Sequence, residues 1–120
     1  MSNKSTAVEF LTTCALGVVK DAYAKYAAPG FIHHNQYFKG DGPSLRRAME
    51  EASASSPNKS FEVRQLIEEG NKVVCYSHVV KEDMQIAVVH IFRFVDGKIV
   101  ELWDVGQQII PDSPNENGLF

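Results

Sequence analysis

The stretch that decides the fold is residues 90–107, which read HIFRFVDGKIVELWDVGQ. Two β-prone runs flank the Asp96-Gly97 pair, and a pair of this kind is a strong signal for a β-hairpin. The register of the hairpin matters, because a slip of one residue moves every side chain of a strand to its other face. The stretch therefore predicts two long antiparallel strands whose register fixes which side chains share a face.

The preferred register has a three-residue loop at residues 95–97, with Gly97 in the left-handed conformation. In this register Arg93 and Glu101 fall together on one face. Four apolar residues gather on the other face: Phe92, Phe94, Val100 and Leu102. Because the apolar residues close into one surface, this register is preferred over a two-residue loop.

The choice of register also decides whether His90 and Asp104 lie together. With the three-residue loop, His90 lies near Leu102 and Asp104, so two titratable groups sit within an apolar wall. A two-residue Asp-Gly loop would place His90 opposite Trp103 and leave Asp104 on the other face. The hairpin thus carries the best candidate for an active site.

The composition indicates one globular domain. The chain has 120 residues, of which 44% are hydrophobic and 22% charged, and its formal net charge is -3 with the signs interspersed. No basic patch favours nucleic acid or an anionic membrane as partner, and no apolar run reaches the roughly twenty residues of a membrane span. The N-terminal MSNKSTAVEF lacks the apolar core of a signal peptide, and Cys14 and Cys75 fit buried free thiols. We therefore expect a cytoplasmic protein.

Three helices are predicted in the first half. Residues 6–9 have the spacing of a capping box, which predicts a helix that begins near Ala7. Asp21 is a candidate cap for a second, short helix that ends at Pro29-Gly30. A third helix is predicted to begin at residues 41–43, where proline follows Asp-Gly.

The second half has the period of two that is typical of strands. Residues 31–38 are predicted as an extended segment or short strand, and residues 61–64, 71–80 and 84–94 lead into the hairpin. Helices followed by successive antiparallel strands indicate an α+β domain, in which a strongly curved sheet wraps the N-terminal helix. Residues 109–120 have no periodic pattern, but they contain four apolar residues: Ile109, Ile110, Leu119 and Phe120. We expect this irregular segment to fold back over the mouth of a cavity.

Two motifs resemble those of a known family. FIHHN begins at Phe31, and HIFRFVDGKIVELWDV begins at His90, with an aspartate fourteen residues after the histidine. Together they resemble the SnoaL-like polyketide cyclase family of the NTF2-like superfamily, over nearly the whole chain. The resemblance implies an NTF2-like (cystatin-like) cone of three N-terminal helices packed on a curved antiparallel sheet. It also implies a cofactor-independent enzyme that moves a proton next to a carbonyl group of a small hydrophobic or aromatic molecule, as an aldol cyclase or isomerase does.

The resemblance also assigns roles to residues of this chain. It implies that Asp104 is the catalytic acid/base, that His90 assists it, and that Asn35 contacts the substrate. Desolvation by apolar neighbours would favour the protonated form of Asp104. The structural alternatives are a carboxylate at a solvated rim and a histidine satisfied within the core. Members of the superfamily also include ligand-binding and scaffold domains, so a non-catalytic small-molecule-binding domain is the second hypothesis.

Further residues are candidates for contact with substrate. His33 and His34 are neighbours in an extended segment, so only one of them is expected to face a cavity, and His34 is chosen. The aromatic candidates are Tyr23, Phe92 and Trp103, which would suit a flat ligand but would equally fill a core. The spacing of the histidines and of Asp104 matches no metal motif, so no metal is predicted.

A homodimer is predicted through the outer face of the sheet. In the preferred register five apolar residues lie opposite the cavity: Val89, Ile91, Ile99, Trp103 and Val105. Exposed apolar surface of this extent is unusual on a monomer, and a two-fold interface is the ordinary way to cover it.

Overall fold

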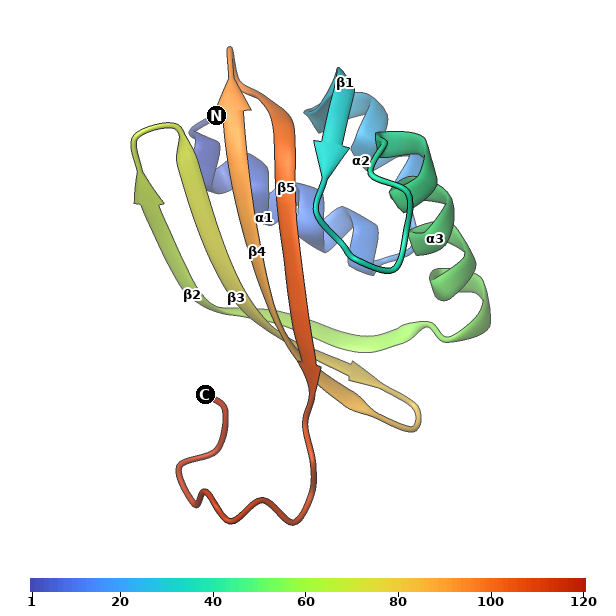
Figure 1. Cartoon of the computed structure of the whole chain (residues 1–120), viewed down its shortest axis with the longest axis vertical. Coiled ribbons are helices and arrows are strands. Elements are labelled where there is room, and N and C mark those ends of the chain that lie inside the picture. Colours follow the sequence, from blue (N-terminus) through green and yellow to red (C-terminus); the bar gives the residue numbers. More distant parts are fainter.

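The computed structural model describes residues 1–120 and is an α+β fold, as predicted. The elements are α1 (Asn3–Ala15), α2 (Val19–Tyr26), β1 (Ala27–His33), α3 (Gly42–Ser55), β2 (Asn58–Glu69), β3 (Lys72–Lys81), β4 (Gln85–Val95) and β5 (Lys98–Gln108). The five strands form one sheet in the order β1-β5-β4-β3-β2. Figure 1 shows the strongly curved sheet, with the three helices on one side of it.

The first helix begins earlier than predicted, whereas the third begins at the predicted residues. The first helix starts at Asn3 because the side chain of Ser2 accepts a hydrogen bond from the backbone N–H of Ser5, so the expected start near Ala7 is wrong. The third helix starts as predicted. The Asp41 carboxylate caps it by accepting the backbone N–H of Ser44 at 3.1 Å.

Strand β1 lies beside β5 and runs parallel to it (Figure 1). It spans residues 27–33 instead of the predicted 31–38, and the chain leaves the sheet at His34. His33 pairs with Leu102 and therefore shares its inner face, whereas His34 points to the outer face. This edge strand brings the histidine-rich segment to the sheet next to the C-terminal half of the hairpin.

The hairpin register differs from the preferred one. The turn has two residues, Asp96 and Gly97, with φ of 49° and 77°, and Val95 pairs with Lys98. A β-bulge follows, because Phe94 pairs with Ile99 whereas Arg93 pairs with Glu101. The expected three-residue loop is therefore wrong.

The bulge nevertheless brings His90 and Asp104 together. Val100 is the extra residue of β5, and an extra residue reverses the side to which the following side chains point. His90 then pairs directly with Asp104 on the inner face. The two residues were predicted to lie together there, but because of a three-residue loop and not because of a bulge. Ile99 is fully buried in the core, so its predicted place on the outer face is wrong.

The core fills the space between α1 and the inner face of the sheet. Phe10 on α1 packs edge to face on Tyr23 of α2 and on Phe92 of β4, with ring centroids 5.2 and 5.9 Å apart. All three side chains are buried. These contacts join the two N-terminal helices to the sheet, so α1 and α2 form one wall against which the curved strands close.

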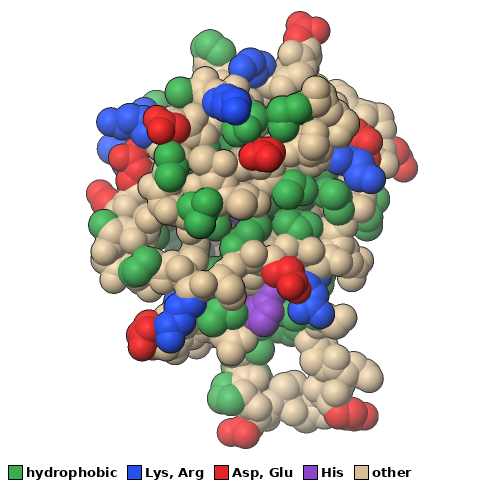
Figure 2. Space-filling view, turned by 180° about the vertical axis from the view of Figure 1, so that it is seen from behind, with side chains coloured by type: hydrophobic (Ala, Val, Ile, Leu, Met, Phe, Trp, Pro, Cys, Tyr) green, Lys and Arg blue, Asp and Glu red, His purple; other side chains and the backbone are tan.

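The surface of the helical side is mixed in character. Figure 2 shows acidic and basic side chains interspersed there, with hydrophobic side chains across the middle of the face. None of the three helices combines the length and the hydrophobicity needed to cross a bilayer. No single-sign charged patch dominates the face seen in Figure 2.

The C-terminal segment runs away from the helices and then turns back toward the strands (Figure 1). The Tyr76 hydroxyl donates to the backbone carbonyl of Leu119 at 2.5 Å. The Phe120 ring lies against the rings of Tyr76 and His78, at centroid distances of 5.0 and 4.8 Å. These residues of β3 point outward, so the prediction that the segment covers the cavity mouth is wrong. On the outer face the terminal ring contacts the rings of Tyr76 and His78.

Candidate active site

A pocket of about 570 Å³ lies between the inner face of the sheet and the loop that follows β1. Its lining includes Val79 on β3, Ile86, Val88 and His90 on β4, Asp104, Val105 and Gly106 on β5, and His34, Asn35, Gln36 and Tyr37 from the loop. The pocket therefore joins the apolar end of the sheet to a polar rim.

His90 and Asp104 form the polar centre of this pocket. His90 Nε2 lies 3.5 Å from Asp104 Oδ1, and the two side chains are 12% and 20% exposed. Burial lowers the pKa of His90, although the Asp104 carboxylate acts in the opposite direction. Desolvation is the larger effect, so the imidazole is neutral at pH 7. Its Nδ1 is buried and has no hydrogen-bond partner in the protein.

Asn35 completes the centre from the loop. Its amide nitrogen donates to Asp104 Oδ2 at 2.8 Å, and its amide oxygen accepts the backbone N–H of Tyr37 at 3.0 Å. The second bond fixes which end of the amide faces the carboxylate. Asp104 is thus hydrogen-bonded by Asn35 on Oδ2 and lies 3.5 Å from the His90 ring on Oδ1, and Asn35 keeps one N–H for another acceptor.

His33 shapes the loop rather than the pocket. Its Nδ1 accepts the backbone N–H of Asn35 at 3.0 Å, so the ring proton is on Nε2, which donates to the carbonyl of Lys39 at 2.6 Å. The ring is buried, with an exposed fraction of 4%. His33 therefore fixes the position of Asn35, a role that the sequence did not indicate.

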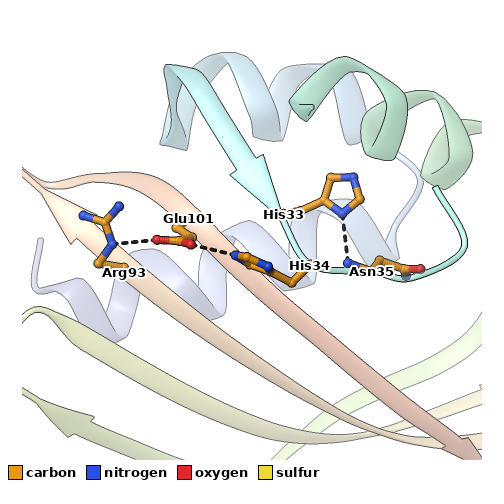
Figure 3. A network of polar contacts seen from close by, with 5 residues as sticks. All are labelled: His33, His34, Asn35, Arg93 and Glu101. Carbon is orange, nitrogen blue, oxygen red and sulfur yellow. Dashed lines mark hydrogen bonds and ion pairs between the residues drawn. The ribbon is translucent and has the colours of Figure 1, made fainter. Parts of the chain in front are cut away.

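His34 lies on the outer face, at the rim of the pocket. Figure 3 shows its ring directed toward Glu101, while His33 points to the helical side. The His34 ring stacks on Trp103 at 4.9 Å, and its Nε2 lies 2.6 Å from Glu101. Hydrogen bonds from His34 and Arg93 lower the pKa of Glu101. The chosen histidine and Trp103 thus belong to an outer-face network, away from Asp104.

The other two aromatic candidates are core residues. Phe92 is fully buried and does not line the pocket. The Tyr23 hydroxyl donates to the sulfur of Met49 at 3.2 Å, and Tyr23 lines a separate depression between α2, β1 and α3. Of the five predicted substrate contacts, Asn35 and His34 line the pocket with His90 and Asp104, and only Asn35 hydrogen-bonds to that pair.

The apolar wall of the pocket was not among the predicted site residues. Val88 and Ile86 alternate with His90 along β4, and the period of two alone would have placed them on the same face. Val79 comes from β3, where only the pairing of strands reveals it. Tyr37 comes from the loop after β1, where strand periodicity does not predict the direction of a side chain.

The arrangement suits proton transfer. A carboxylate, a neutral imidazole and an amide meet within apolar walls, where charges are weakly screened. No group of three or more His, Cys, Asp or Glu side chains comes close enough to hold a metal ion.

Solved structures of other proteins share this fold. The curved sheet and the helical wall have the NTF2-like fold, which the chain shares with an NTF-2 like protein of unknown function from Burkholderia xenovorans at a TM-score of 0.75 and 16% identity, over 93% of this chain and 88% of that one. AclR from Streptomyces galilaeus, described as "a putative hydroxylase", gives a TM-score of 0.77 and 21% identity over 94% and 89% of the two chains. A "putative ketosteroid isomerase" from Kribbella flavida gives 0.72 and 15% over 98% and 87%.

The family follows from the sequence itself. The family model for SnoaL-like polyketide cyclase matches residues 5–110, and the chain belongs to this family. No curated protein matches the chain significantly. At identities of 21% or less the structural neighbours establish the fold alone.

Proposed function

We propose that this protein is a cofactor-independent acid/base enzyme that acts next to a carbonyl group of a small hydrophobic or aromatic molecule, as an aldol cyclase or isomerase. The observation that supports this most is Asp104, held by Asn35 and placed beside a neutral imidazole in a pocket with apolar walls. A carboxylate in such surroundings is a suitable base for a proton α to a carbonyl.

Asp104 takes the proton in this proposal. Its two oxygens are oriented by Asn35 and His90, so the substrate carbon must approach from the open side of the pocket. Removal of the proton leaves an enolate, whose oxygen needs a hydrogen-bond donor. The proposed donor is the remaining N–H of Asn35, on the nitrogen that already bonds to Asp104. Return of the proton from Asp104 to a different carbon gives an isomer. Attack of the enolate carbon on a second carbonyl group of the substrate closes a ring, and the alkoxide that forms takes the proton from Asp104.

His90 acts through Asp104. Because the imidazole is neutral, it adds no positive charge that would weaken the carboxylate as a base. While Asp104 is ionised, the ring proton is best placed on Nε2, toward Oδ1. Nδ1 is then an acceptor. His90 thus orients the base.

Proton exchange tests the proposal directly. Incubation of the protein with cyclic ketones in D2O, followed by proton NMR, measures whether the α protons exchange faster than in buffer. Native mass spectrometry of the same mixtures measures retention of the ketones. Exchange above the buffer rate supports the enzyme, whereas retention without exchange would replace it with the non-catalytic binding domain.

A further inference from the structure

A second chamber adjoins the active-site pocket on the side of the helices. Its volume is about 150 Å³, and it lies between α1, α3 and the strands β2 and β3. Val79 and His90 line both the pocket and this chamber. The pocket and the chamber are therefore neighbours, with the side chains of Val79 and His90 between them.

The walls of the second chamber are mainly apolar, with Ser53, Asn58 and Lys81 as polar lining residues, and the Lys81 ammonium group donates to the backbone carbonyl of Ser56. Met49 and Ala52 of α3 face Leu11 and Cys14 of α1. Burial raises the pKa of the Cys14 thiol to about 12, so this side chain stays protonated at neutral pH. The chamber suits the hydrocarbon part of a ligand.

One polar atom in this wall has no partner. Asn58, at the start of β2, donates from its amide nitrogen to the carbonyl of Ala15 at the end of α1, at 3.2 Å. That bond fixes the orientation of the amide, because only the nitrogen can donate. The amide oxygen, Oδ1, is buried and accepts no hydrogen bond within the protein. Buried acceptors of this kind are uncommon unless a ligand or a water completes them.

We infer that the ligand is elongated and occupies both chambers, with its carbonyl group beside Asp104 and a hydrogen-bond donor, such as a hydroxyl group, at the far end that Asn58 Oδ1 accepts. The inference rests on the proposed function only for the position of the carbonyl group. The length of the ligand and the donor at its far end rest on the shared lining and on the unpaired oxygen.

Three cyclohexanones provide matched probes. One carries a para-hydroxyphenyl group opposite its ketone, one carries a phenyl group there, and cyclohexanone itself is the short probe. Their affinities for the full chain are measured by ligand-observed NMR. The hydroxyl probe is expected to bind about threefold to tenfold more tightly than the phenyl probe, which is the usual net gain from one hydrogen bond. Equal affinities, or no binding of either long probe, would overturn the inference.

Two kinds of variant locate the effect. In Asn58→Leu the ratio of the two affinities is expected to fall to about one, and because both probes are measured on the same variant, a general loss of stability does not alter the ratio. Ala52→Leu narrows the chamber and is expected to weaken both long probes about tenfold relative to cyclohexanone, the short probe. Ala54→Leu, an exposed residue of the same helix outside the chamber, is the control. Equal effects of the two leucine variants would contradict the second chamber as a binding site.

The two proposals can fail separately. If the hydroxyl preference depends on Asn58 but no probe exchanges its α protons, the second chamber stands as a binding site and the proposed chemistry is wrong. If cyclohexanone exchanges its protons but the hydroxyl group adds nothing to affinity, the chemistry stands and the elongated ligand is wrong.

Discussion

Asp104 is the residue on which the proposed chemistry depends. The substitution Asp104→Asn keeps the shape of the side chain but removes the base. The expected result is a loss of α-proton exchange of about a hundredfold to ten-thousandfold, which is the usual contribution of a general base. The unfolding temperature and the NMR exchange rate are to be measured together. Asp96→Asn in the exposed hairpin turn is the matched control, and undiminished exchange by the Asp104 variant would show that the site is misplaced.

His90 is expected to contribute less. His90→Gln removes the imidazole but keeps a polar side chain of similar length, so exchange should fall by a smaller factor than in the Asp104 variant. The double variant should lose less than the two separate losses combined, because the residues act on one proton. A loss of rate in the double variant equal to the product of the two single losses would show that His90 and Asp104 act independently.

The neutral state of His90 predicts the pH profile. Because burial lowers the pKa of this imidazole, its protonation falls below the ordinary histidine range near pH 6.5. The rate of α-proton exchange should therefore show no change caused by a titrating histidine between about pH 6.5 and 8. Any loss of rate caused by protonation of His90 should appear at lower pH. An NMR titration of the His90 ring checks the assignment. A ring that titrates above pH 6.5 would contradict it.

Glu101 gives a prediction for stability. The bonds from His34 and Arg93 favour its ionised form in the folded protein and lower its pKa. The unfolded chain therefore takes up the proton first as pH falls, so the stabilisation is present above about pH 4.3 and is lost below it. Glu101→Gln should lower the free energy of unfolding at pH 7. The difference in this free energy between the wild-type protein and the variant should become smaller as pH falls. Urea unfolding at several pH values measures this, with the exposed Glu68→Gln as control. A difference that grows on acidification would contradict it.

At the scale of elements, one aromatic side chain of α1, Phe10, contacts both another helix and the sheet. Phe10 joins α1 to α2 and to the sheet, so Phe10→Ala should cost about 3–5 kcal/mol of unfolding free energy. Leu16→Ala, just beyond the helix and 77% exposed, should change stability by less than about 0.5 kcal/mol. Chemical denaturation compares the two. Similar costs would show that α1 is not held by this ring.

The elements themselves could be predicted largely from the sequence, and their exact pairing could not. The start of α3 followed from Asp41 and Pro43, because capping and proline geometry are local. The bulge at Val100 had no local signal, since it is decided by which residues of two strands fit the core. The two faces of the histidine segment depended likewise on the pairing of β1 with β5, which joins residues distant in sequence.

In the candidate site, too, local motifs could be recognised in the sequence, whereas the faces of the strands could not. His90, Asp104 and Asn35 came from motifs and meet in the pocket. Phe92 and Trp103 were chosen as aromatic neighbours of these residues in the sequence. Phe92 lies two residues from His90, so it shares the inner face but is buried in the core. Trp103 is next to Asp104 in the strand and therefore points to the outer face.

For the whole molecule, we propose a homodimer through the outer face of the sheet. Without Ile99, the apolar residues of this face are Val89, Ile91, Trp103 and Val105, and Val105 is 67% exposed. Val105→Glu should convert the dimer to a monomer, because a charge would be buried at the interface. Val95→Glu at the hairpin end, where the side chain is 47% exposed, is the control. Light scattering that gives the monomer mass for the wild-type chain at micromolar concentration would remove this prediction.

The bulge in β5 has a consequence for comparing distant relatives. Val100 reverses the facing of every residue after it, so a relative without the extra residue could keep an aspartate at the aligned position and yet expose it on the outer surface. An alignment that shifts by one residue across the Asp96-Gly97 turn would likewise assign the acid to the wrong side. At identities near 15–21% such shifts are easily made. Gains and losses of acid/base chemistry in this fold can therefore follow from the insertion or deletion of a single residue, with no substitution at the acid itself.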